Sequence, residues 1–238
     1  WFVHFGATDE ILVDSHPHIG TNKLPQIIES MRETIISHGG EVNFDSKMTD
    51  LLLENGKIVG LEINGAEKIK FDNVILATGH SARDIFELLH SKKIKLEAKA
   101  FALGVRVEHS QELIDTIQYH GRLNDEFLPP ASYSLVAQVE ERGVYTFCMC
   151  PGGIIAPCAT EPGEVVTNGW SPSKRNNPYS NSGIVVSVEP KDFKDHETNP
   201  FVCLDFQRSV EKACWEAAGK TQNVPAQRLA DFVNGRVS

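Results

Sequence analysis

The sequence lacks the features that mark several specialised classes of protein. No apolar run approaches the roughly 20 residues that a membrane-spanning helix needs, so no membrane association is expected. No basic stripe is present and the formal net charge is −9, which argues against a nucleic-acid partner. The five cysteines are few and odd in number, which favours a reducing cytoplasm over a disulfide framework.

Two further absences concern metal sites and the start of the chain. No CxxC or HxxxH spacing accompanies His16, His18 or His80, so no metal site is predicted. The first residue is Trp1 rather than methionine, and no secretory signal is visible. We therefore expect this chain to be a portion of a longer protein.

The first part of the sequence predicts an α/β organisation. Residues 22–38 place apolar side chains near a helical repeat, and Gly39-Gly40 supplies a stop. Short β-type runs follow, separated by Asn55-Gly56 and Asn64-Gly65, and Asn-Gly is the strongest local hairpin signal. The pattern predicts a three-stranded meander.

The run VILAT, residues 74–78, predicts a strand buried on both faces of a parallel sheet. It leads through Gly79 into the helical pattern SARDIFELLHS, which Ser81 can cap. A glycine at the carboxyl edge of such a sheet lets a ligand approach the backbone, although a simple tight turn explains it equally well.

The character of the sequence changes near residue 97. Residues 99–109 and 133–149 predict longer strands with a helix between them, and residues 204–218 predict a helix that ends at Gly219. The stretch 151–200 is rich in Pro, Gly, Asn and Ser. We place a domain boundary here, with an α/β part at 1–96 and a mixed, β-rich part at 97–238.

The segment YTFCMCPGG, residues 145–153, leaves three interpretations open. A metal site would need further soft ligands, and the spacing from Cys150 to Cys158 matches no zinc pattern. A disulfide between Cys148 and Cys150 would close a very small, strained ring. In a regular strand the two thiols would nevertheless lie on the same face. The favoured interpretation is a loop in which Pro151 ends the strand and Gly152-Gly153 let backbone approach a planar ligand.

Arg106 lies in a predicted strand, where alternation places it opposite Val105 and Val107 and on the side of Glu108. Two interpretations remain open for this arginine. It is either part of a solvated face with a weak Glu108 pair, or a bidentate ligand for an anionic substrate.

The order of these motifs resembles the second half of the dinucleotide-binding domain in the glutathione-reductase-like FAD flavoprotein superfamily. More specifically, the chain resembles a bacterial group of FAD-dependent dehydrogenase-like proteins over nearly its whole length. The segments that carry the resemblance are PHIGTNKL (17–24), ATGHSARD (77–84), FALGVRVEH (101–109), FCMCPGG (147–153) and VVTNG (165–169).

The resemblance implies a partial Rossmann-like FAD-binding domain with a three-stranded meander, followed by a β-rich α+β substrate domain. It implies an FAD-dependent oxidoreductase that acts on a small-molecule substrate, with NAD(P)H as one candidate electron donor. The superfamily's GxGxxG loop, which cradles the FAD pyrophosphate, is missing from this chain. We therefore expect the isolated chain to be inactive. The alternative function is a non-catalytic interaction domain on a flavoprotein-like scaffold.

The resemblance also assigns roles to individual residues. Those assigned to the cofactor are Lys47 and Met48 near the adenine, Thr78, Gly79 and His80 beside the FAD, and Gly152 and Gly153 across the flavin ring. Those assigned to the substrate side are His18, Arg106, Cys148 and Cys150. Thr21 and Lys23 fall near a helix start, where the lysine could meet a phosphate.

Overall fold

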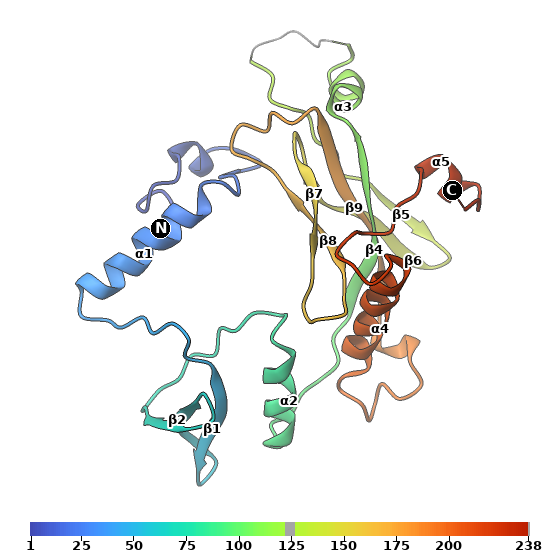
Figure 1. The fold of residues 1–238 in the computed structure, drawn as a ribbon. Helices are drawn as coiled ribbons and strands as arrows, with labels where there is room; N and C mark the ends of the chain where they lie inside the picture. The colour runs from blue at the N-terminus through green and yellow to red at the C-terminus, as the bar shows by residue number, and fades with distance from the viewer. Residues whose placement is uncertain (122–126, 238) are drawn as a thin grey trace. The chain divides into compact units, whose positions relative to one another are not determined.

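The computed structural model describes residues 1–121 and 127–237, which form two compact units (Figure 1). One unit contains residues 29–97, and the other contains residues 1–28 together with 98–238. The chain passes from the second unit to the first within helix α1, Leu24–Ser37, which confirms the helix predicted over 22–38. Gly39 follows with a φ of 84° and ends the helix.

The unit of residues 29–97 contains the predicted meander. Strands β1 (Met48–Glu54), β2 (Lys57–Ile63) and β3 (Glu67–Lys70) pair antiparallel in chain order. Both Asn-Gly pairs have positive φ values, as tight hairpin turns require, so both predicted turns are confirmed. Leu51, in the middle of β1, is buried at 2% exposure.

Helix α2, Arg83–Ser91, confirms the helix expected after Gly79, but its cap differs from the prediction. The residue at the cap position is Ala82. Ser81 accepts from the Arg83 N–H with its backbone carbonyl, and its side chain does not cap the helix. After the helix, Lys92 Nζ pairs with Asp50 on β1 at 2.6 Å. The hydrogen bond from Lys92 lowers the pKa of Asp50.

The prediction of a buried strand at residues 74–78 is wrong. Residues 73–79 form no strand, and Ile75 is 93% exposed. Every strand pairing in the described part of the chain is antiparallel. An apolar run of this kind needs parallel neighbours and a cover on both faces, and the described residues supply neither.

The second unit is built around a four-stranded antiparallel sheet in the order β4-β9-β6-β5 (Figure 1). Its strands are β4 (Phe101–Ser110), β5 (Val136–Val139), β6 (Arg142–Cys150) and β9 (Tyr179–Val188). The single strand predicted over 133–149 is instead a hairpin, because Glu140 and Glu141 turn the chain with positive φ values. The result is a mixed α/β chain with antiparallel sheets.

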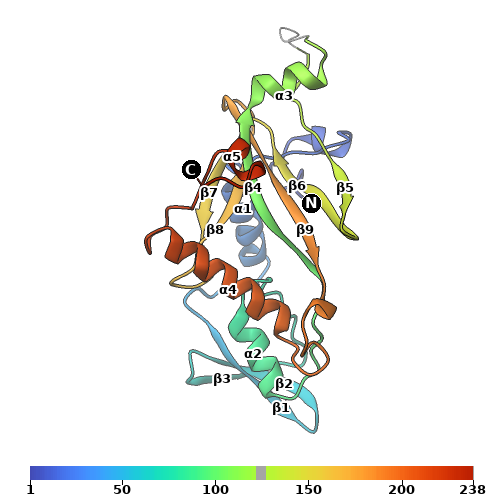
Figure 2. The ribbon, with the colours of Figure 1, turned by 90° about the vertical axis from the view of Figure 1, so that its right-hand side faces the viewer.

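A two-stranded hairpin, β7 (Ile154–Cys158) and β8 (Val166–Trp170), contacts β6 and β9. Helix α4, Val202–Ala217, lies beside this hairpin (Figure 2), where the Glu211 carbonyl accepts from the Val165 N–H at 3.2 Å. The remaining helical elements are α3 (Gln111–Gln118), α5 (Leu229–Val233) and the short 3-10 turns η1 (Asp9–Leu12) and η2 (Pro190–Asp192).

Two other observations complete the fold. Arg142 on β6 holds Asp192 of η2 with two bonds of 2.7 Å, and this contact lowers the pKa of Asp192 to about 2.

Among the described residues, no helix combines the length and the apolar character needed to cross a bilayer.

Candidate functional site around Arg106, Asn181 and Cys150

The central strand β9 buries three consecutive polar residues, Ser180, Asn181 and Ser182, each at 0% exposure. Buried polar groups are unfavourable unless they are hydrogen-bonded, so such a run in the middle of a sheet needs partners. Because strand residues alternate between faces, Asn181 points to one side of the sheet and the two serines to the other. The site lies on the Asn181 side.

Arg106 connects three strands at this position. Its Nη1 donates to Asn181 Oδ1 at 2.6 Å and to the Cys148 carbonyl at 3.2 Å. The two contacts tie β4 to β9 and to β6. Arg106 is half-buried, and its position opposite the buried Val107 agrees with the predicted alternation. Because Arg106 is half-buried and bonded to two partners, the interpretation as part of a solvated face does not describe it.

The two cysteines of the CMC segment do not share a face, contrary to the regular-strand expectation. The pairing of β6 with β9 slips between Phe147 and Cys150, and Cys148 has a φ of 50°. This bulge rotates the chain so that Cys148 is exposed while Cys150 is buried at 6% exposure. The thiol of Cys150 lies 3.5 Å from the Cys148 carbonyl. Arg106, Asn181 and Cys150 together are called the cluster below, and Cys150 is its buried thiol.

The glycines near the cluster pack against this chain's own backbone. A Cβ on Gly152 would collide with the Arg175 carbonyl, and one on Gly153 would collide with the Trp170 carbonyl. Gly152 N–H also donates to Gln111 Oε1 at 2.8 Å. A Cβ on Gly169 of β8 would lie 2.6 Å from Asn181 Oδ1 and 2.7 Å from Cys150 Sγ. Hairpin β7–β8 is therefore pressed directly onto the cluster.

This packing tests the predicted flavin contacts. Gly152 and Gly153 are buried, and the close approach that they permit is made by protein carbonyls in this structure. The flavin contact assigned to them stays a prediction. Thr78, Gly79 and His80, in the other unit, are exposed. Gly79 has a φ of 80° and nothing within 4 Å of the position of a Cβ, and its contact with FAD stays a prediction.

Lys47 and Met48 also belong to the unit of residues 29–97. Met48 begins β1, and Lys47 Nζ pairs with Asp84 at 2.7 Å, which lowers the pKa of that carboxyl. The structure therefore brings Arg106, Cys148 and Cys150 together in one unit. Lys47, Met48 and residues 78–80 belong to the other unit.

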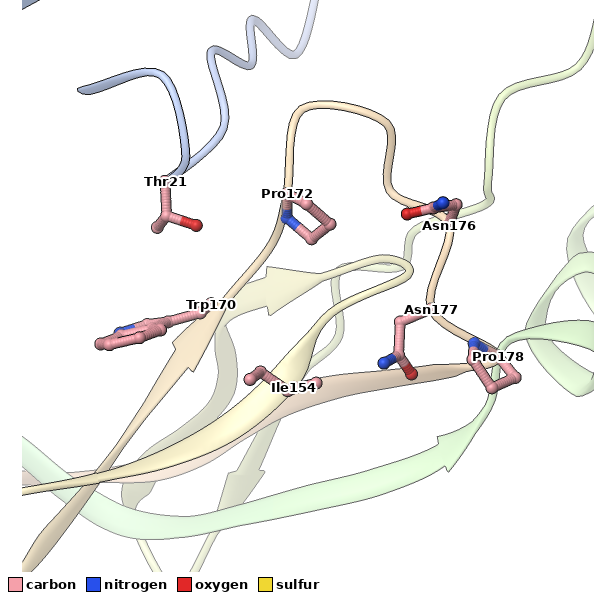
Figure 3. A pocket seen from close by; sticks show the side chains of 7 residues that line it. All are labelled: Thr21, Ile154, Trp170, Pro172, Asn176, Asn177 and Pro178. Carbon is pink, nitrogen blue, oxygen red and sulfur yellow. The ribbon is translucent and has the colours of Figure 1, made fainter. Parts of the chain in front are cut away.

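The segment containing His18 is attached to the loop after β8. His18 Nε2 lies 2.9 Å from the Pro172 carbonyl, and the Ser171 carbonyl accepts from both the Thr21 N–H and its hydroxyl, at 3.1 and 3.2 Å. A pocket of about 370 Å³ lies at this junction, between the β7–β8 hairpin and the loop 172–178 (Figure 3). Its lining is Thr21, Ile154, Trp170, Pro172, Asn176, Asn177 and Pro178.

The opposite face of β9 carries a second polar pair. His109 of β4 and Tyr133 lie 2.6 Å apart between Nε2 and the phenolic oxygen. Burial lowers the pKa of His109 and raises the pKa of Tyr133, so both side chains are neutral near neutral pH. Across residues 1–121 and 127–237, no group of three His, Cys, Asp or Glu side chains is arranged to hold a metal ion.

The environment of Cys150 predicts an unreactive thiol. Burial, with a smaller contribution from Cys148, raises the pKa of Cys150 to about 11. Its thiolate fraction at pH 8 is then about one in a thousand, whereas an ordinary cysteine is about a quarter ionised. We expect a thiol reagent at pH 8 to modify Cys148 readily and Cys150 only on unfolding, as mapped by mass spectrometry.

The control for this labelling is the pair of variants Cys148→Ser and Cys150→Ser. The first should remove a fast-reacting thiol, and the second should leave the fast phase unchanged. Rapid labelling of Cys150 in the folded protein would contradict the buried position.

Several residues of the site were missed by sequence reasoning. The sequence pattern predicts a β-type run at GIVVSVEP, residues 183–190, and places Asn181 in the preceding stretch rich in Pro, Gly, Asn and Ser. In the structure β9 begins earlier, at Tyr179. The sequence predicts a helix at Gln111, and a β-type run together with the motif VVTNG at Gly169, but no role in a site for either residue. The four residues before GIVVSV extend the strand, but three of them are consecutive polar residues without the alternation that predicts a strand.

Comparison with known proteins shows to which family the chain belongs. An uncharacterized protein of Clostridium beijerinckii is 42% identical over 235 residues, which is 98% of this chain and 44% of the relative. The chain thus spans less than half the length of that relative. Residues 100–238, more than half of the chain, match the model of the family described as FAD-dependent protein, C-terminal domain-like. The chain belongs to this family of FAD-dependent proteins.

Proposed function

We propose that the chain is part of an FAD-dependent oxidoreductase and that its second unit supplies the substrate side. Membership of an FAD-dependent family supports the cofactor. The bound flavin would carry the hydride or electrons, while protein groups orient the substrate. In this proposal the exposed residues Thr78, Gly79 and His80 contact the cofactor.

The observation that carries the substrate-side role is an unused donor in the buried cluster. Asn181 Nδ2 is buried and has no hydrogen-bond partner within the described residues. Its Oδ1 is occupied by Arg106, so the amide presents its N–H groups beside a guanidinium. A buried donor without a partner is unfavourable by about 1–3 kcal/mol. Gly169 of hairpin β7–β8 covers the cluster, so an acceptor that enters when this hairpin moves aside would relieve the unpaired donor.

The chemistry of this pair selects the substrate class. Arginine and an amide NH2 are both donors, and Cys150 is held neutral by burial, so the cluster favours a small anion such as a carboxylate. In this proposal Arg106 and Asn181 bind and orient the carboxylate. Cys150 packs beneath them and takes no covalent part, which also disfavours a thiol redox pair with the exposed Cys148.

The proposal is tested on the complete protein. We expect a visible flavin spectrum, directly or after reconstitution with FAD, that is bleached by NADH or NADPH under anaerobic conditions. Addition of acetate, oxalate or benzoate should perturb the flavin spectrum of the wild type but not that of Arg106→Met. A protein that takes up no flavin would overturn the cofactor assignment, and equal perturbation of both proteins would overturn the role of Arg106.

A further inference from the structure

Two half-buried arginines of the second unit, Arg106 and Arg175, have no carboxylate to neutralise them. Four other arginines of the chain lie between 2.6 and 3.4 Å from an Asp or Glu oxygen; they are Arg32, Arg142, Arg208 and Arg228. Within the described residues, neither Arg106 nor Arg175 forms an ion pair within 4 Å. A cation that has lost part of its water without gaining a partner is unfavourable, so a bound anion would stabilise both arginines.

Arg175 has a donor that no described residue uses. Its Nε is buried and has no hydrogen-bond partner in the part of the chain that the structure describes. Burial lowers the pKa of the Arg175 guanidinium, and the charges of Asp14 and Cys150 oppose this shift without offsetting it. The guanidinium remains charged, because arginine is not deprotonated in proteins, and one of its N–H groups is left for an acceptor.

The loop that contains Arg175 is fixed against the turn that follows β6. The Ser171 hydroxyl donates to the Pro151 carbonyl at 2.8 Å. Further along the loop, the Asn177 N–H donates to the Gly152 carbonyl at 3.2 Å. Between these two bonds the Arg175 carbonyl lies where a Cβ on Gly152 would stand, and Arg175 has a φ of 47°, which is uncommon for arginine. The loop thus holds Arg175 in place before any ligand binds, which reduces the entropy lost on binding.

This arrangement brings the charge of Arg175 to the cluster. Cys150 is the last residue of β6 and leads directly into the turn that the Arg175 loop covers. Cys150 interacts electrostatically with Arg106 and also with Arg175. A Cβ on Gly169 would touch both Arg106 Nη1 and Cys150 Sγ, so the first guanidinium lies beside the thiol. Two unpaired guanidiniums therefore act on one buried position, next to the unused donor of Asn181.

We infer that the site takes a small dicarboxylate, with one carboxylate on Arg106 and Asn181 and the other on Arg175. This inference deepens the proposed function and rests on it. Each planar guanidinium neutralises one carboxylate and matches its two oxygens. A phosphate is a poorer match at Arg175, because it carries close to two negative charges near neutral pH and one guanidinium neutralises only one. Entry requires the same movement of hairpin β7–β8 that uncovers the cluster.

The test is calorimetric titration of the complete protein with pairs of acids of equal chain length, malonate against propionate and succinate against butyrate. We expect the wild type to bind the dicarboxylate of at least one pair about tenfold to a hundredfold more tightly, the range for one hydrogen bond to a charged group. Arg175→Gln should remove this preference and leave the monocarboxylate affinity unchanged, which also shows that the variant is folded. Arg106→Met should weaken both members of each pair.

Lys174→Gln is the matched control, because Lys174 precedes Arg175 in the same loop, is exposed and loses the same charge. It should leave the preference intact. Equal affinity for both members of each pair in the wild type, or an unchanged preference in Arg175→Gln, would overturn the inference. So would an equal loss of preference in Lys174→Gln, which would indicate a general effect of charge.

The same titrations distinguish this inference from the proposed function. Equal binding of monocarboxylates and dicarboxylates removes only the role of Arg175. Absence of binding by all four acids would overturn the carboxylate site of the proposed function as well. The FAD assignment is tested by the flavin spectrum, which is a separate measurement.

Discussion

Gly152→Ala is expected to destabilise the unit that contains residues 98–238 by about 3 kcal/mol or more. Two effects add at this position. Gly152 has a φ of 51°, where an L-residue with a Cβ costs about 1–2 kcal/mol. The new Cβ would also overlap the Arg175 carbonyl, which is backbone and cannot rotate away as a side chain can. Relieving this overlap requires the 150–153 turn to shift, which also disturbs the bond from Gly152 N–H to Gln111.

The matched control is Gly219→Ala, in the same unit after α4. Gly219 has a φ of 68° but nothing within 4 Å of the Cβ position, so only the backbone penalty of about 1–2 kcal/mol remains. Urea unfolding followed by tryptophan fluorescence measures both, because Trp170 and Trp215 lie in this unit. Equal losses for the two variants would show that the Gly152 site is open rather than packed.

The same variant distinguishes two roles for the glycine pair. If Gly152 and Gly153 serve as packing against residues 170 and 175, Gly152→Ala lowers stability, and FAD affinity changes only as a consequence. If they face a flavin ring, the variant lowers FAD affinity while the free energy of unfolding changes little beyond the backbone penalty. The packing of both glycines leads us to expect the first result.

The elements predicted correctly are those whose cause is local. The Asn-Gly turns and the helices at 24–37 and 202–217 follow from side-chain periodicity and from positive-φ residues within a few positions. The strand at 74–78 failed because its apolar side chains specify burial but not a partner, and the described residues provide no parallel neighbour. A bulge at Cys148 reverses the alternation that a period of two would give.

The site was predictable only in part for a related reason. Arg106 was identified from its residue type and its place in a strand. Its partner Asn181 depends on the register of β4 with β9, in which Glu108 faces Asn181 and Arg106 faces Gly183. The Arg106–Asn181 contact spans 75 positions in sequence. Hydrophobic pattern alone does not fix the register that creates it, because the strand has polar residues on both faces.

The Arg106–Asn181 pair gives the second large effect. Arg106→Met leaves Asn181 Oδ1 buried without its partner, and Asn181→Leu removes the 2.6 Å partner of Arg106. Each change should lower the free energy of unfolding by about 2–3 kcal/mol, because an abandoned buried polar group loses its solvation as well as its bond. The double variant should lose less than the sum, with a coupling of about 1–2 kcal/mol, measured by urea unfolding as a double-mutant cycle.

That cycle also separates stability from function. Replacing both partners by apolar groups removes the unpaired Asn181 Nδ2 together with the charge, so the double variant regains part of the stability that either single variant loses. If the pair served only the fold, the double variant would behave like the wild type in every assay. If the pair binds a carboxylate, the double variant folds and takes up FAD but shows no spectral response to acetate or benzoate. We expect the second result. An apolar pair at these positions would pack without an unpaired polar group, whereas the guanidinium and the amide leave one buried donor unused.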